Sequence, residues 1–158
     1  MDRVAELIRS LSLTPHPEGG HYREIWRSSE RVAPADGRGG RSALTAIYFL
    51  LPAGAVSRWH RVRSDELWQH VEGAPLELAL VPPDLTRLDR RLLGPLAPEL
   101  EPMRGVPADC WQAARSLGSY TLVVCTVGPG FEFADFEMMS DRELDTLCET
   151  LPGATAYR

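Results

Sequence analysis

The sequence predicts a mainly β protein: one antiparallel barrel or sandwich domain with a short helix near each end. Short strand-like segments separated by glycine and proline fill the middle of the chain, which is typical of closed or two-sheet antiparallel folds. Apolar residues at helical spacing are confined to the two ends. A length of 158 residues corresponds to one domain with a sizeable core, so we expect a single domain over residues 1–158.

The first predicted element is a helix over about residues 2–12. Apolar side chains recur at helical spacing between Val4 and Leu11, and Asp2 can cap the first turn. Pro15 and Pro17 follow, and proline does not continue a helix. We expect the apolar face of this helix to lie as a lid on the barrel.

The barrel is predicted between about residues 20 and 136. Segments with strand-like composition lie between turn residues such as Gly54 and the Pro82-Pro83 pair. The expected strands cover residues 21–27, 43–51, 57–61, 66–71, 76–81, 110–114 and 120–127, with one more inside 85–96 before the Gly94-Pro95 turn. No linker or second domain is indicated.

The last predicted element is a helix over about residues 141–151. Ser140 and Glu143 have the spacing of a capping box. Apolar residues then share one helical face from Leu144 to Leu151, and Pro152-Gly153 ends the helix.

Composition argues against several functional classes. The net charge is −5 without a basic stripe, so nucleic acid is not expected as a partner. All 17 basic residues are arginine, which excludes lysine Schiff-base chemistry and a Walker-type phosphate loop.

Three features predict a cytoplasmic protein with no membrane partner. The three cysteines form no CxxC pair and are expected to be reduced thiols. The charged start of the chain is unlike a signal peptide. No run approaches the ~20 apolar residues of a membrane span.

The most informative pattern consists of four residues: Gly54, His60, Glu66 and Gly73. A turn glycine, an imidazole, a carboxylate and a second turn glycine follow one another, with strand-like segments on either side. Two adjacent strands can thus direct a His and a Glu into a barrel, which suits a metal ion or acid–base catalysis.

This spacing resembles the first motif of the cupin superfamily, in which Gly is followed by His-x-His, Glu and Gly at set intervals. The position of the second histidine holds Val62 here. The second cupin motif, Pro-x-Gly-x-x-His, is echoed by residues 107–112, where Asp109 replaces the glycine and Gln112 replaces the metal-binding histidine.

A closer resemblance extends over nearly the whole chain. Four segments resemble the uncharacterised cupin-5 family: HPEGGHYRE (16–24), TAIYFLL (45–51), SDELW (64–68) and VGPGFEFADF (127–136). The resemblance implies an RmlC-like jelly-roll fold, a double-stranded β-helix with a ligand-sized pocket, and a homodimer. It implies no single activity, because one fold carries many functions.

The candidate catalytic residues are His60 and Glu66, as a general base and the group that orients it. With Gln112, the same residues form the candidate metal-binding set, suited to a divalent ion such as Fe(II), Mn(II), Ni(II) or Zn(II). Strand alternation places Trp68 and His70 on the face of Glu66, so we expect both in a small-molecule pocket.

The remaining candidate ligand-binding residues are Tyr48, Tyr120, Gln112 and Arg23. Arg23 can pair with a carboxylate or phosphate, on a polar rim that includes Glu18. Other residues are expected away from the pocket: His16 as an exposed or capping residue, and Trp59 and Trp111 in outer packing or dimer contacts.

Three functions remain open for such a pocket. The first is an isomerase or epimerase that acts on a sugar, a nucleotide-like compound or another small polar metabolite, with His60 as base. The second is a metal-dependent dioxygenase or isomerase. The third is a non-catalytic protein that binds a small ligand. A purely structural role, in which His60 and Glu66 form a buried pair that orders the barrel, is the alternative to all three.

Overall fold

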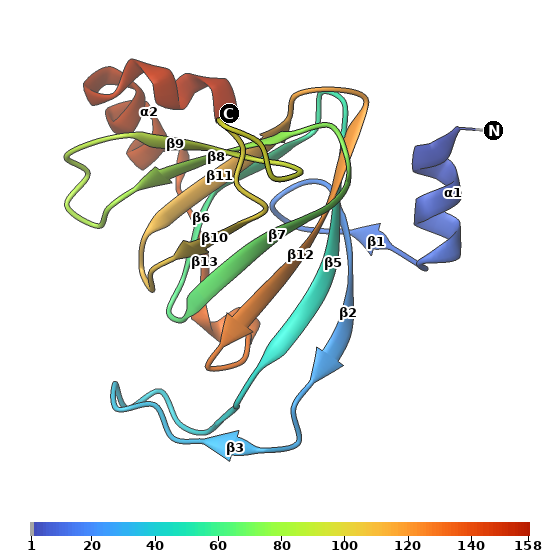
Figure 1. The fold of residues 1–158 in the computed structure, drawn as a ribbon. Coiled ribbons are helices and arrows are strands. Elements are labelled where there is room, and N and C mark those ends of the chain that lie inside the picture. Colours follow the sequence, from blue (N-terminus) through green and yellow to red (C-terminus); the bar gives the residue numbers. More distant parts are fainter. Residues whose placement is uncertain (1) are drawn as a thin grey trace.

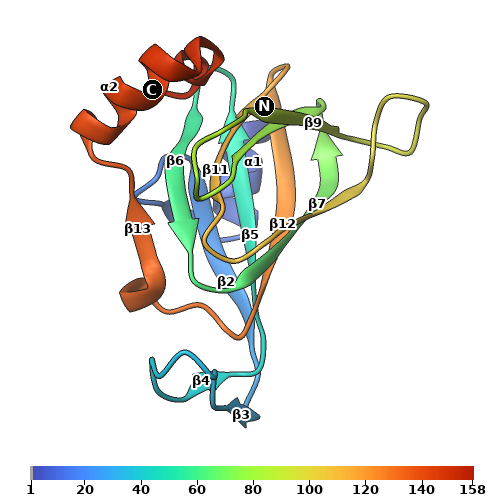
Figure 2. The ribbon, with the colours of Figure 1, turned by 90° about the vertical axis from the view of Figure 1, so that its left-hand side faces the viewer.

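The computed structural model describes residues 2–158, which form two antiparallel sheets packed face to face as a barrel (Figure 1). In hydrogen-bonded order, the first sheet contains β1 (Thr14–Pro15), β2 (His21–Arg27), β5 (Thr45–Pro52), β12 (Tyr120–Gly128), β7 (Asp65–Gly73) and β10 (Met103–Val106). The second sheet contains β13 (Phe136–Met138), β6 (Val56–Val62), β11 (Trp111–Ser116), β8 (Leu76–Val81) and β9 (Asp89–Leu93). A separate pair, β3 (Arg31–Val32) and β4 (Arg41–Ser42), extends from the lower end of the barrel in Figures 1 and 2.

The chain path confirms the predicted fold class. From β5 to β8, and again from β10 to β13, successive strands alternate between the two sheets. This alternation is the double-stranded β-helix, or jelly roll, that the sequence led us to expect.

Helix α1 (Arg3–Ser10) covers part of the outer face of the six-stranded sheet. The Asp2 side chain accepts a hydrogen bond from the Val4 amide at 3.1 Å and so caps the helix. Leu7 is buried against Leu50 of β5 and Leu122 of β12. The helix thus protects an outer face of the sheet rather than the interior of the barrel.

The C-terminal segment covers the outer face of the five-stranded sheet (Figure 2). Helix α2 (Asp141–Thr150) begins with the predicted capping box of Ser140 and Glu143, and the 3-10 helix η2 (Pro152–Tyr157) follows it. Trp59 donates a hydrogen bond from Nε1 to the carbonyl oxygen of Ala154 at 3.1 Å, and its ring packs edge-on against Tyr157. Trp111 is buried in the same apolar cluster, so the chain's own C-terminus covers both outward-facing tryptophans.

Five strands were missed by the sequence analysis. β3 and β4 form the separate pair, and β1, β10 and β13 are short strands at the edges of the two main sheets, where one side lacks a partner and the apolar pattern is weak. The strand expected within residues 85–96 is shorter, because Leu85 has a φ of +56° and closes a turn with Pro82. β9 begins only at Asp89.

None of the helices formed by residues 2–158 is long and apolar enough to cross a membrane.

Candidate functional site

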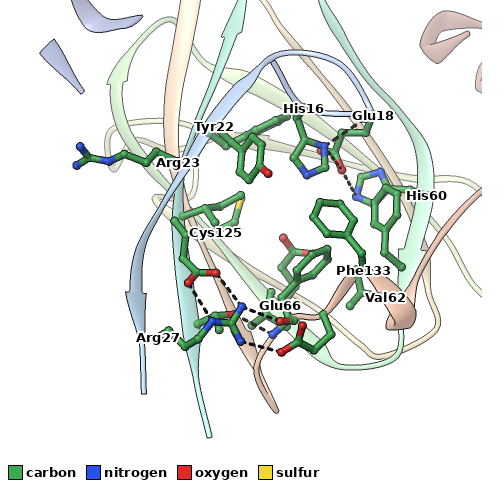
Figure 3. A pocket seen from close by; sticks show the side chains of 18 of the residues that line it. His16, Glu18, Tyr22, Arg23, Arg27, His60, Val62, Glu66, Cys125 and Phe133 are labelled. Atoms are coloured by element: carbon green, nitrogen blue, oxygen red, sulfur yellow. Dashed lines mark hydrogen bonds and ion pairs between the residues drawn. The ribbon is translucent and has the colours of Figure 1, made fainter. Parts of the chain in front are cut away.

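A cavity of about 260 Å³ lies between the two sheets (Figure 3). Its apolar wall consists of Ile47, Phe49, Val62, Val127, Phe131, Phe133 and Phe136. Its polar wall includes His16, Glu18, Tyr22, His60, Glu66 and Cys125. Phe49 and Cys125 also belong to the apolar core, so the core fills the barrel up to the floor of the cavity.

The short loop between β1 and β2 brings Glu18 into this cavity. Gly19 and Gly20 have φ values of +114° and +69°, a backbone region that favours glycine. The loop is closed by a hydrogen bond from the His16 amide to the Gly20 carbonyl at 3.0 Å. The Arg58 amide of β6 donates to the Glu18 carbonyl at 2.9 Å. The loop is thereby fixed on β6, and Glu18 is only 6% exposed.

Glu18 and His60 form a buried pair that shares one proton. The His60 Nδ1–H donates to the carbonyl oxygen of Arg58 at 2.7 Å, so in the neutral ring Nε2 carries the lone pair. That Nε2 lies 3.2 Å from Glu18 Oε2, while Ser57 Oγ donates to Glu18 Oε1 at 2.7 Å. A hydrogen bond between Nε2 and Oε2 needs one proton, either on the carboxyl group or on the imidazole.

Burial decides where that proton lies near neutral pH. Loss of solvation raises the pKa of Glu18 to about 8, against a smaller lowering by the Ser57 hydrogen bond. Loss of solvation also lowers the pKa of His60, partly offset by the charge of Glu66. The neutral pair, with the proton on Glu18 and directed to His60, is therefore the favoured state at pH 7.

Glu66 supplies a second titratable carboxyl group on the cavity wall. Its Oε2 accepts a hydrogen bond from Gln112 Nε2 at 2.6 Å, and Cys125 also interacts with it through a hydrogen bond. Burial raises the pKa of Glu66 to about 7, partly offset by the charge of His60. At neutral pH a substantial fraction of Glu66 is ionised and can accept a proton.

His16 lies on the cavity wall; of the two positions expected for it, exposed or capping, the structure contradicts the exposed one. Its side chain is 5% exposed and its ring lies edge-on against Tyr22, with a centroid distance of 4.5 Å. The Glu18 amide donates to His16 Nδ1 at 3.2 Å. Burial lowers the pKa of His16 to about 4, so the ring is neutral at pH 7.

Gln112 and Trp68 lie behind Glu66, not on the cavity wall. The Gln112 side chain is buried, and its Oε1 accepts a hydrogen bond from Trp68 Nε1 at 2.8 Å. Trp68 packs edge-on against Phe49 in the apolar core. These two residues hold the carboxyl group of Glu66 in place, since the Gln112 amide bridges Trp68 and Glu66.

Three other candidate residues lie outside the cavity. His70 Nε2 is 3.3 Å from the carbonyl oxygens of Gly73 and Ala74, near the end of β7. Tyr48 and Tyr120 pack in the cluster beneath α1, on the outer face of the sheet. The expectation that Tyr48 and Tyr120 line the pocket therefore fails, because both side chains lie on the face of the sheet opposite to the cavity.

The rim of the cavity contains arginine side chains with different surroundings. Arg27 forms hydrogen-bonded ion pairs with Glu24 at 2.8 Å and with Glu132 at 3.0 Å. Arg23 borders the cavity, but its guanidinium group extends away from it (Figure 3). Within residues 2–158, no unpaired cation points into the cavity.

Sequence reasoning assigned Glu18 to the rim and overlooked His16 and Cys125. His16 and Glu18 belong to the HPEGG segment, whose two glycines predicted a turn but not its direction. The signal that could have placed them is the tight turn itself, because it holds His16 and Glu18 close together next to the first strand of the barrel. Cys125 lies on the inward face of β12, which strand alternation alone could have indicated.

The candidate metal set of His60, Glu66 and Gln112 does not fit a metal ion in this arrangement. His60 Nε2 is hydrogen-bonded to Glu18, and Gln112 Oε1 accepts from Trp68. Across residues 2–158, no group of three or more His, Cys, Asp or Glu side chains is arranged to hold a metal.

The buried titratable groups predict that the protein loses stability as pH rises from 6.5 to 8. The pKa of Glu18 is raised from 4.5 to about 8 and that of Glu66 to about 7, so the folded state retains protons that the unfolded chain has released. The free energy of unfolding then falls with pH. His16 and His60 have lowered pKa values and act in the opposite sense, but this contribution fades above pH 6.5 as the unfolded histidines lose their protons.

This loss is expected to be on the order of 1–2 kcal/mol and can be measured by urea unfolding at several pH values between 6.5 and 8. Glu18→Gln and Glu66→Gln should each flatten the dependence. A wild-type curve that is flat or rises over this interval would contradict the assignment of raised pKa values to these carboxyl groups.

The alternating strands and the cavity between the sheets define a cupin-type jelly roll. The chain belongs to the cupin superfamily family DUF985 (Cupin_5), whose family model matches residues 5–139. The cupin-5 resemblance predicted from the sequence is thus confirmed.

Solved structures agree with this membership. A protein from Shewanella oneidensis is 35% identical with a TM-score of 0.81, over 96% of this chain and 91% of that one. A hypothetical protein from Leishmania major is 33% identical with a TM-score of 0.80, over 94% and 92%. Oxalate decarboxylase from Bacillus subtilis, at 14% identity and a TM-score of 0.59 over 85% and 33% of the two chains, shares the fold alone. No curated protein matches the chain.

Proposed function

We propose that the cavity binds a small organic metabolite and catalyses proton transfer on it, as an isomerase or epimerase does. The observation that carries this proposal is the buried Glu18–His60 contact, with 3.2 Å between Oε2 and Nε2, in a cavity whose apolar wall includes four phenylalanines. General acid–base catalysis is most effective when the pKa of the catalytic group is near the working pH. The pKa values of about 8 for Glu18 and about 7 for Glu66 meet that condition.

The two carboxyl groups have complementary roles in this proposal. Glu66, in its ionised form, takes a proton from a carbon atom of the substrate, and the C–H electron pair stays on the substrate. Glu18 returns a proton to the substrate, and the Ser57 hydroxyl group continues to donate to the Glu18 carboxylate that remains. Exchange with solvent then restores the initial protonation states of Glu18 and Glu66.

The test is incorporation of solvent deuterium into small metabolites. A panel of sugars, hydroxy acids, amino acids and uncharged ketones is incubated with the protein in deuterated water and followed by NMR. Wild type is compared with the double variant Glu18→Gln/Glu66→Gln. Glu137→Gln is the matched control, because Glu137 is an exposed carboxylate that pairs with Arg61. Exchange in wild type and in the control, but not in the double variant, is expected.

A non-catalytic binding protein is the second candidate, favoured by the four phenylalanines in the apolar wall of the cavity. The same panel separates the two functions. Ligands that shift the melting temperature of the wild type without any deuterium incorporation would favour binding alone and would sink the proton-transfer proposal.

A metal-dependent reaction is the remaining alternative. The oxalate decarboxylase of similar fold has Mn(II) centres, but in this chain an ion at His60 would have to break the contact with Glu18. Metal analysis after incubation with Mn(II), Fe(II), Ni(II) or Zn(II), for wild type and His60→Ala, tests it. Stoichiometric metal that the variant fails to bind would favour this alternative over proton transfer without metal.

A further inference from the structure

The Nε2 atom of His16 is a hydrogen-bond donor that points into the cavity. The Glu18 amide can only donate, so His16 Nδ1, at 3.2 Å, must be the acceptor, and the same nitrogen lies 3.5 Å from Oε2 of the Glu18 carboxyl group. The neutral ring therefore carries its proton on Nε2. Figure 3 shows this second nitrogen pointing into the cavity, and within residues 2–158 it has no hydrogen-bond partner. His16 and His60 thus have opposite tautomers on one cavity wall.

The His16 ring is held in a fixed orientation. Beyond its contact with Tyr22, it packs edge-on against Phe49 and Phe136, with centroid distances of 5.9 and 5.8 Å. The Glu18 amide fixes the rotation of the ring about its own axis. A donor held in this way does not reorganise when charge develops on a bound oxygen atom, which makes its stabilisation of that charge effective.

The charges around the cavity favour an uncharged ligand. Arg27 is neutralised by Glu24 and Glu132, and Arg23 extends away from the cavity. Among residues 2–158, the buried titratable groups that line the cavity include two carboxyl groups and no arginine. A phosphate or carboxylate on the ligand would lie near the Glu66 carboxylate without a cation to compensate it, which is unfavourable in a low-dielectric site.

The size of the cavity restricts the ligand further. Its volume of about 260 Å³ lies below the ~300–1,000 Å³ of pockets for drug-sized ligands. A single ring with a few substituents fits this volume, whereas a sugar nucleotide exceeds it. The aromatic side chains of Phe49, Phe131 and Phe136 offer flat surfaces to such a ring.

We propose that the substrate is a small uncharged carbonyl compound and that His16 is a further catalytic residue, whose Nε2–H donates to the carbonyl oxygen. This inference rests on the proton-transfer function proposed above and deepens it. The C–H bond next to the carbonyl breaks, its proton passes to the Glu66 carboxylate, and its electron pair forms the C=C bond of an enolate. The negative charge develops on the oxygen that His16 binds. Glu18 then delivers a proton to carbon, and the carbonyl group re-forms.

The first experiment tests the tautomer without any ligand. Protein labelled with ¹⁵N on its histidine rings is studied by NMR at pH 7, and His16→Gln identifies the His16 signals among the four histidines. The expected result is a neutral His16 protonated at Nε2 and a neutral His60 protonated at Nδ1. A His16 ring that is protonated at Nδ1, or at both nitrogens, overturns the proposal.

The second experiment uses cyclohexanone, labelled with ¹³C at its carbonyl carbon, as the probe. In the wild type we expect deuterium exchange next to the carbonyl and a downfield shift of the bound carbonyl signal. His16→Phe keeps a flat ring but no donor, and should lose the shift and lower the exchange rate by about 10²–10³-fold with little change in KM. His16→Gln, which retains an N–H donor, should recover part of both, and it also serves if the phenylalanine variant fails to fold.

The two proposals fail in different ways. If the wild type exchanges charged members of the panel but neither exchanges cyclohexanone nor shifts its carbonyl signal, the proton-transfer function stands and the carbonyl class is overturned. If His16→Phe exchanges cyclohexanone as fast as the wild type, the role of His16 is overturned while the function stands. If no panel member exchanges with any variant, both proposals fail together.

Discussion

Replacing Glu18 by glutamine is expected to lower the deuterium-exchange rate by about 10²–10⁴-fold and to leave the free energy of unfolding at pH 7 within about 1 kcal/mol of wild type. Both effects follow from the raised pKa of about 8. Glu18 is mainly neutral in the folded state at pH 7, and glutamine is a neutral group of the same shape. Its amide can still accept from Ser57 and donate to His60, but it cannot release a proton to the substrate.

The comparison with Glu18→Ala makes this test specific. Alanine leaves the buried Ser57 hydroxyl and His60 Nε2 without their partner, so it should cost about 1–3 kcal/mol of stability in addition to activity. Urea unfolding and exchange rates are measured for both variants. Exchange in Glu18→Gln within a factor of three of the wild type would show that Glu18 is not the acid and that its contact with His60 is structural.

The pH dependence of exchange adds a second criterion. Activity needs an ionised Glu66 and a protonated Glu18, whose pKa values are about 7 and about 8. As pH rises, the exchange rate should therefore reach a maximum between pH 7 and pH 8 and fall on either side. The two apparent pKa values of this profile belong to the coupled pair rather than to one residue.

Most of the fold could be predicted because its signals are local. The apolar runs that form β5, β8 and β12 are strand-like in any context, and both helices have side-chain caps that the sequence displays. The edge strands β10 and β13 could not be predicted, because their pairing with β7 and β6 is determined by the closed barrel. A segment such as Met-Arg-Gly-Val has little strand preference of its own.

The candidate site was predictable in part, for a related reason. His60 and Glu66 lie on the cavity wall, as their positions on adjacent strands suggested. The group in contact with His60 is Glu18, about 40 residues earlier in the chain, and no spacing rule connects a loop residue with a strand that distant. Gln112 and Trp68 share the correct face with Glu66 but lie deeper, because alternation carries no information about where the core ends and the cavity begins.

The second large effect concerns the loop that carries Glu18. Gly19→Ala is expected to lower the deuterium-exchange rate by at least about 10²-fold and to cost about 1–3 kcal/mol of stability. Gly19 has a φ of +114°, and a Cβ atom there would lie 2.1 Å from the carbonyl oxygen of Val56. That oxygen belongs to the backbone of β6 and cannot move without disturbing the strand. The loop must shift instead, and Glu18 loses its position opposite Ser57 and His60.

Gly54→Ala is the matched control, because it isolates backbone strain from displacement of the loop. Gly54 also has a positive φ, +76°, but no atom lies within 4 Å of the position of an added Cβ. The Gly54→Ala variant should lose about 1–2 kcal/mol of stability and keep the wild-type exchange rate. If Gly19→Ala lost no more activity than Gly54→Ala, the placement of Glu18 by this loop would not matter for the chemistry. If instead Gly19→Ala were as inactive as Glu18→Gln but less stable, the result would show that the backbone conformation of Gly19 holds Glu18 in its catalytic position against His60.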